Sequence, residues 1–175
     1  MSELLDNILS RENMLEAYNQ VKANKGSAGI DGITVEEIDN YLRQYWRPTK
    51  ELIKQRKYKP QPVLRVEIPK PNGGVRQLGI PTVMDRMVQQ AIVQIISPLC
   101  EPHFSETSYG FRPNRSCEKA IIKLLEYLND GYEWIVDIDL EKFFDTVPQD
   151  RLMSLVHNII QDGDTESLIR KYLHS

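Results

Sequence analysis

The segment from Val63 to Ile80 constrains the fold of this chain more than any other. It opens with Val63 to Ile68, whose second half alternates apolar and polar residues as a half-buried strand does. Asn72-Gly73 follows, a dipeptide typical of the tight turn of a β-hairpin, and Val75 to Ile80 has the character of the returning strand. Apolar residues at helical spacing lie on both sides of this hairpin. The pattern therefore predicts an α+β fold.

Helices are predicted wherever apolar residues recur every three or four positions. Thr34 and Glu37 have capping-box spacing, Ser116 is a suitable N-cap, and Pro48 and Pro148 suit the first turn of a helix. Asp162-Gly163-Asp164 is interpreted as a turn. The predicted helices cover residues 12–21, 38–45, 48–53, 84–99, 116–128 and 148–160.

The segment Trp134 to Leu140 is the most informative for function. As a strand it would place Ile135, Asp137 and Asp139 on one face and the other apolar residues on the opposite face. Two aspartates on a buried face are costly unless something compensates their charge. A divalent ion such as Mg²⁺, which serves phosphoryl transfer, would do so. Alternatively, both aspartates face solvent on an edge strand, and their spacing does not decide between the two.

Charge is distributed unevenly along the chain, although the formal net charge is only -3. Residues 47–76 contain nine basic residues against two glutamates, and residues 130–166 contain ten acidic residues against one lysine and one arginine. One interpretation of this charge distribution is a basic surface for phosphate backbones beside an acidic site for divalent cations. The alternative is that both charged segments are simply solvated faces. Lys70 and Arg76 flank the predicted turn, where they are suited to hold a triphosphate or to remain solvated.

Length and composition exclude several other classes. With 175 residues and 41% hydrophobic residues the chain suits one soluble domain or slightly more. It has no run of 18 apolar residues, so we expect no membrane association. The N-terminus carries acids where a secretory signal carries lysines. Because only Cys100 and Cys117 are present, no disulfide framework is expected, and the cytoplasm is the expected location.

Four blocks in order resemble the opening blocks of bacterial group II intron reverse transcriptases (maturases). The blocks are Gly26 to Gly32, Ile68 to Pro81, Tyr109 to Ser116 and Asp137 to Asp145, and the resemblance covers nearly the whole chain. The resemblance implies the N-terminal portion of the reverse transcriptase fingers–palm fold. Residues 1–55 would form a helical extension with a glycine-rich loop, 56–130 the fingers, and 131–175 the start of the palm, including its first strand.

The resemblance also implies site residues and a cofactor. Asp139 matches the family's catalytic aspartate and would bind Mg²⁺ with the backbone carbonyl of Leu140. Phe144, five residues after Asp139, resembles the aromatic residue that excludes a ribose 2′-hydroxyl, whereas Asp137 falls outside the family pattern. Lys70 and Arg76 would contact the phosphates of the incoming nucleotide. The residues implied to contact RNA or template are Gly26, Ser27, Arg65, Tyr109, Arg112 and Arg115.

The implied partners are an intron RNA template, a DNA primer and deoxynucleoside triphosphates. The family completes its metal site with a later Tyr-x-Asp-Asp segment, which does not follow Asp145 here. We therefore expect a fragment that is inactive alone, with an exposed palm edge that favours a homodimer.

Three alternatives remain at this stage. One is an RNA-binding splicing helper without polymerase activity, and another is a retron or diversity-generating reverse transcriptase. The third is a haloacid-dehalogenase-type phosphatase, disfavoured because only 36 residues follow Asp139.

Overall fold

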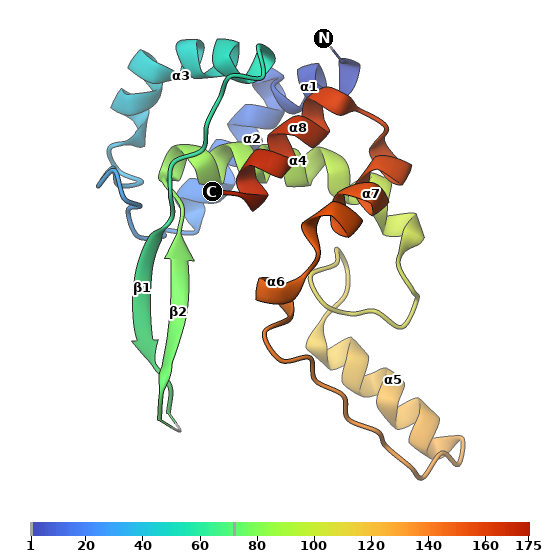
Figure 1. Ribbon diagram of the computed structural model, residues 1–175. Coiled ribbons are helices and arrows are strands. Elements are labelled where there is room, and N and C mark those ends of the chain that lie inside the picture. The colour runs from blue at the N-terminus through green and yellow to red at the C-terminus, as the bar shows by residue number, and fades with distance from the viewer. Residues whose placement is uncertain (1, 72) are drawn as a thin grey trace. The chain divides into compact units, whose positions relative to one another are not determined.

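The structure is a computed structural model that describes residues 2–71 and 73–175 (Figure 1). It consists of two mainly helical units, and the first of them carries a β-hairpin. The first unit comprises the chain up to Ser97 together with Gln149–Ser175, and the second comprises Pro98–Pro148. Within the described residues, no helix is both long and apolar enough to cross a bilayer.

The first unit takes its elements from both ends of the chain. They are α1 (Glu3–Ile8), α2 (Arg11–Ala23), α3 (Ile38–Lys54), β1 (Leu64–Pro69), β2 (Val75–Ile80), α4 (Val83–Cys100), α7 (Gln149–Ile160) and α8 (Gly163–Leu173). The end of α4 continues into the second unit, which contains the 3₁₀ turn η1 (Glu101–His103), α5 (Cys117–Asn129) and α6 (Phe143–Thr146). The predicted α+β class is confirmed.

The hairpin forms where the sequence predicts it, with β1 and β2 antiparallel and Ile68 opposite Arg76. At the turn, Gly73 and Gly74 have φ of 85° and 84°, backbone angles that residues other than glycine rarely adopt. The Lys70 amide donates to the Gly74 carbonyl at 3.0 Å and closes the turn. The predicted turn residue Asn72 lies outside the described residues.

The core of the first unit lies between α1, α2, α4 and α8. The apolar face of α4 supplies its centre, with Val88 and Ala91 fully enclosed. Leu5 and Ile8 of α1 and Leu168 of α8 pack into the same cluster. This explains why a helix from the end of the chain belongs with helices from its beginning.

A buried carboxylate fixes the base of the hairpin to this core. Asp85, 1% exposed, accepts hydrogen bonds from the Tyr58 hydroxyl at 2.6 Å and the Tyr172 hydroxyl at 3.2 Å on one oxygen. Its other oxygen accepts from the Thr82 hydroxyl at 2.8 Å and the Gln61 amide at 3.1 Å. Gln61 precedes β1 and Thr82 follows β2, so one side chain holds both ends of the hairpin. Burial and the nearby carboxylate raise the pKa values of both tyrosines, which therefore remain proton donors.

The helix predictions are confirmed except at two places. Residues 38–54 form one helix, α3, in which Pro48 is internal, instead of two helices. A proline inside a helix has no amide donor, which costs about 3 kcal/mol. The packing of Ile38 and Ile53, near the two ends of α3, against the core outweighs this cost. Asp162-Gly163-Asp164 begins α8 instead of forming an isolated turn, because Asp162 caps that helix by accepting from the Thr165 amide at 2.7 Å.

The predicted first palm strand, Trp134 to Leu140, is wrong for this structure. These residues have no regular secondary structure and are all exposed. A strand needs neighbours that pair with its amides and carbonyls, and β1 and β2 pair only with each other among the described residues. Alternation alone therefore did not make a strand here.

Candidate nucleic-acid interface

The tip of the hairpin presents the two predicted triphosphate ligands together. Arg76 lies opposite Ile68, and Lys70 lies two positions after Ile68, so Lys70 and Arg76 share one face of the hairpin. Both side chains are exposed. A flexible ammonium and a forked guanidinium on one exposed face suit a phosphate group. Arg65, the third basic residue of the hairpin, lies opposite Gly79 and belongs to the other face.

The glycine-rich loop lies against the beginning of α4. Arg86 donates to the Ser27 carbonyl at 2.6 Å, and a Cβ added at Gly26 would lie 2.1 Å from the Arg86 guanidinium. The loop thus partly covers Arg86, and this burial lowers the pKa of its guanidinium. In this structure Gly26 and Ser27 have a packing role; their contact with RNA stays a prediction.

Gly29 of the same loop makes a backbone contact that only glycine permits. A Cβ at Gly29 would lie 2.7 Å from the Thr82 nitrogen and Cα and 2.9 Å from the Pro81 carbonyl carbon. All of these are backbone atoms at the end of β2, which cannot rotate away. The loop is therefore held directly against the hairpin base.

We expect Gly29→Ala to lower the free energy of unfolding by about 1–3 kcal/mol, as overpacking does in a close-packed interior. Urea denaturation followed by circular dichroism measures this. Gly110→Ala is the matched control, because a Cβ at Gly110 meets nothing within 4 Å. A wild-type urea midpoint for Gly29→Ala would show that the loop is not held against the hairpin.

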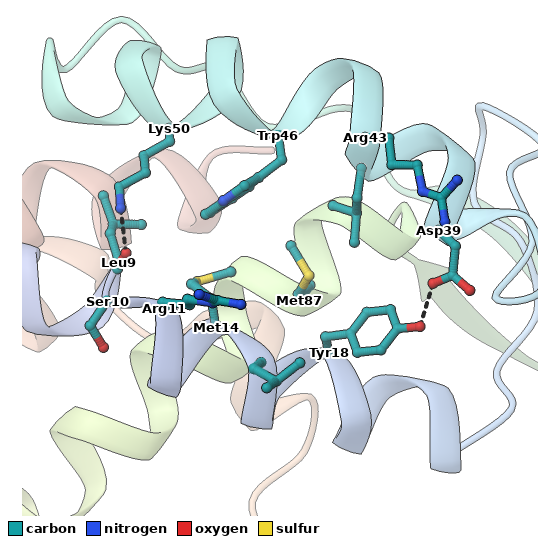
Figure 2. Close-up of a pocket in the computed structure, with 12 residues that line it drawn as sticks. Leu9, Ser10, Arg11, Met14, Tyr18, Asp39, Arg43, Trp46, Lys50 and Met87 are labelled. Carbon is teal, nitrogen blue, oxygen red and sulfur yellow. Dashed lines mark hydrogen bonds between the residues drawn. The ribbon is translucent and has the colours of Figure 1, made fainter.

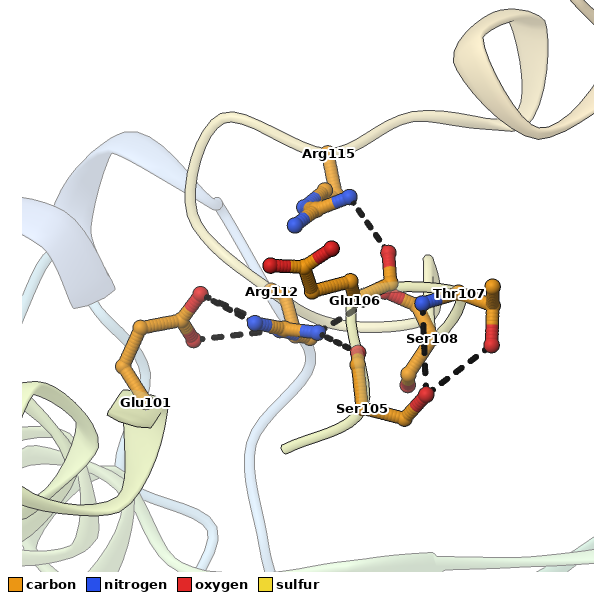
Figure 3. A network of polar contacts seen from close by, with 7 residues as sticks. All are labelled: Glu101, Ser105, Glu106, Thr107, Ser108, Arg112 and Arg115. Carbon is orange, nitrogen blue, oxygen red and sulfur yellow. Dashed lines mark hydrogen bonds and ion pairs between the residues drawn. The ribbon is translucent and has the colours of Figure 1, made fainter. Parts of the chain in front are cut away.

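In the second unit, Arg112 organises the loop between η1 and α5 (Figure 3). Its guanidinium binds the Glu101 carboxylate through Nε at 3.1 Å and Nη2 at 2.7 Å, and Nη1 donates to the Ser108 carbonyl at 3.0 Å and to that of Ser105. The side chain is only 7% exposed and lies over the Phe104 ring. The hydrogen bonds from Arg112 hold the pKa of Glu101 below its usual range. Arg112 thus shapes the loop from within, and its predicted template contact stays a prediction.

Tyr109 and Arg115 are half-buried in the same loop and lie against each other. The Arg115 guanidinium lies over the Tyr109 ring, 5.1 Å from its centre, and donates to the Glu106 carbonyl at 2.8 Å. An aromatic ring stacked with a guanidinium is a surface suited to nucleic acid.

Asp139, the predicted catalytic residue, is exposed in an extended segment, as is Leu140. Phe144 follows in α6 and is 86% exposed, with its ring 5.6 Å from that of Phe143. The Asp139 carboxylate and the Leu140 carbonyl are oxygen donors of the kind Mg²⁺ prefers, so the residue types fit this ion. Within residues 2–71 and 73–175, however, no group of three or more His, Cys, Asp or Glu side chains is placed to hold a metal.

Asp139 belongs to the second unit, whereas Lys70 and Arg76 belong to the first. The structure brings together the two residues of the hairpin tip, and separately Tyr109 with Arg115.

Comparison with known proteins decides the family. The family model described as reverse transcriptase (RNA-dependent DNA polymerase) matches residues 68–175, which include the hairpin tip, the Arg112 loop and Asp139. The chain belongs to the reverse transcriptase family. Since this match covers more than half of the chain, the fold-level resemblance seen in the sequence is confirmed.

Curated relatives of this reverse transcriptase chain include proteins encoded by introns. It is 35% identical over 158 residues to the group II intron-encoded protein LtrA of Lactococcus lactis, covering 90% of this chain and 26% of the relative. It is also 35% identical to the putative COX1/OXI3 intron 2 protein of Saccharomyces cerevisiae, covering 93% and 19%, and to protein YkfC of Escherichia coli, covering 98% and 46%. The chain thus spans less than half the length of these relatives.

One groove of this reverse transcriptase chain was not predicted from the sequence. It measures about 810 Å³ and lies between α2 and α3, where Trp46, Met14 and Met87 point into it (Figure 2). Lys50 at one end donates to the Leu9 carbonyl at 2.7 Å. Trp46 lies immediately before the basic stretch 47–76 and was the available signal, but its partners Met14 and Met87 come from α2 and α4.

Proposed function

We propose that this chain supplies the fingers and the first catalytic segment of a group II intron reverse transcriptase, an RNA-directed DNA polymerase. One observation carries the proposal: the region that matches the reverse transcriptase family contains both Asp139 and the Lys70–Arg76 tip. The similarity to intron-encoded proteins over at least 90% of the chain favours the group II type over a retron or diversity-generating enzyme.

In this proposal Asp139 and the Leu140 carbonyl would hold Mg²⁺ together with further ligands from the palm. The ion would neutralise the triphosphate and activate the primer hydroxyl. Lys70 and Arg76 bind the triphosphate by charge and by forked hydrogen bonds. Phe144 fills the space of a ribose 2′-hydroxyl and so selects deoxynucleotides.

The proposed partners are an RNA template, a DNA primer and deoxynucleoside triphosphates. Gly26, Ser27 and Arg65 are proposed to contact RNA from the first unit, and the loop held by Arg112 presents Tyr109 and Arg115 to the template. We also propose self-association, because α5 and residues 134–140 expose apolar side chains. Sedimentation equilibrium of the chain tests it, and a monomer at all concentrations would contradict it.

A primer-extension assay tests the function. We expect the full-length protein that contains these residues to extend a DNA primer on an RNA template with Mg²⁺. The 175-residue chain alone should give no extension. Absence of extension by the full-length protein, with RNA binding retained, would favour the alternative of an RNA-binding splicing helper.

A further inference from the structure

A concave surface of about 760 Å³ lies in the first unit, where the segment after α3 meets the end of α8. Its lining is dominated by basic side chains from two parts of the chain that are more than 100 positions apart. We call it the α8 cationic surface and define it by Arg56, Lys57, Lys59, Arg170, Lys171 and His174. Arg170, Lys171 and His174 lie outside residues 47–76, the basic stretch that is visible in the sequence.

Contacts between the two segments hold this surface together. Lys171 donates to the Arg56 carbonyl, and the Arg56 guanidinium binds the Asp164 carboxylate at 2.5 Å. The next residue, Tyr172, bonds to the buried Asp85 at 3.2 Å. Because α8 is attached on both sides of Lys171, the convergence of charge is a property of the fold.

The charges on this surface are only partly neutralised by the protein. Asp164 pairs with Arg56, and Asp150 pairs with Arg170 at 2.8 Å. Among the described residues, Lys57, Lys59 and Lys171 have no carboxylate within ion-pair distance. Burial, together with repulsion from Lys59 and Arg56, lowers the pKa of Lys171. Cations gathered in one concavity repel one another, and an anion bound there would relieve that repulsion.

We propose that the α8 cationic surface binds the phosphate backbone of RNA; this rests on the proposed function and adds a specific contact site to it. The unpaired cations are lysines, point charges on flexible stems that suit phosphates without reading bases. Among the described residues lining the surface, the small imidazole of His174 is the one aromatic ring, and there is no Phe, Tyr or Trp to form a broad platform for stacking bases. Charges spread over an open surface fit a row of phosphates better than a single small anion.

The affinity of the 175-residue chain for a single-stranded RNA of mixed sequence, measured at several salt concentrations, tests this proposal. Removing one lysine–phosphate ion pair reduces the steepness of log K against log salt by about 0.7 for a single strand. We therefore expect Lys59→Gln/Lys171→Gln to reduce the slope by about 1.4, because two such pairs are removed, and to weaken binding. The matched control, Lys123→Gln/Arg151→Gln, removes the same charge outside the surface and should leave the slope unchanged.

Equal slopes for wild type and the Lys59/Lys171 variant, or an equal reduction in the control, would overturn the proposal. If circular dichroism shows that this variant is unfolded, Lys57→Gln/Lys59→Gln replaces it, since both of its side chains are exposed. This experiment measures RNA affinity and requires no catalysis. Its result can therefore be interpreted even if the full-length protein fails to extend a primer.

Discussion

Replacing Asp139 by asparagine is expected to reduce primer extension by the full-length protein at least about 10²- to 10³-fold, the loss typical of removing one electrostatic group from an active site. Asparagine keeps the size of the side chain and one oxygen, but it removes the negative charge that holds a divalent ion. Because Asp139 is exposed and makes no packing contact that the fold requires, neither the stability nor the RNA affinity should fall. Single-turnover extension and filter binding measure the two effects separately.

Asp137→Asn is the matched control for this experiment. Asp137 is the same residue type, two positions earlier in the same exposed segment, and lies outside the family pattern. Its substitution should leave most of the activity intact. If the two variants lose activity equally, the segment contributes general negative charge and Asp139 is not a specific metal ligand.

Asp85→Ala is expected to lower the free energy of unfolding by about 3–5 kcal/mol, the cost of breaking a buried charged network by removing one partner. Alanine leaves the donors of Tyr58, Thr82 and Gln61 without their acceptor in the interior. Asp85→Asn should cost less, about 1–2 kcal/mol, because one acceptor oxygen remains and a tyrosine hydroxyl can rotate to accept. Urea denaturation at pH 7 measures both.

Two further variants separate the network from a general effect of charge. Glu36→Ala removes an exposed carboxylate and should change stability by no more than about 0.5 kcal/mol. Combining Asp85→Ala with Tyr58→Phe should cost less than the sum of the two single changes, with a coupling of about 0.5–3 kcal/mol. A stability for Asp85→Ala within about 0.5 kcal/mol of wild type would refute the role of this carboxylate.

The sequence predicts the hairpin well because its signals are local. The turn residues and the alternation of β1 and β2 lie within 18 positions, and the register follows from them. The Asp85 network could not be predicted in the same way, since its donors are 24, 27 and 87 positions away, apart from Thr82. An aspartate in an apolar helix face was the only local signal of it.

The segment from Trp134 to Leu140 shows the opposite case. Its alternation is clear, but strand formation depends on partners that the local sequence does not contain. Arg112 shows a third limit: family resemblance marked the residue, whereas its bonds to Glu101 and Ser108 became visible only in the folded loop. Residue types at the candidate site were therefore predictable, and their local partners were not.

The first unit closes late during synthesis, because its elements come from both ends of the chain. Since α7 and α8 complete a body begun by α1 to α4, the ribosome must translate the intervening 51 residues, Pro98–Pro148, before that body can close. Until Tyr172 leaves the exit tunnel, Asp85 lacks one of its donors and the surface that receives Leu168 is open to water. We expect nascent chains ending before α8 to be the most susceptible to proteases and the most dependent on chaperones.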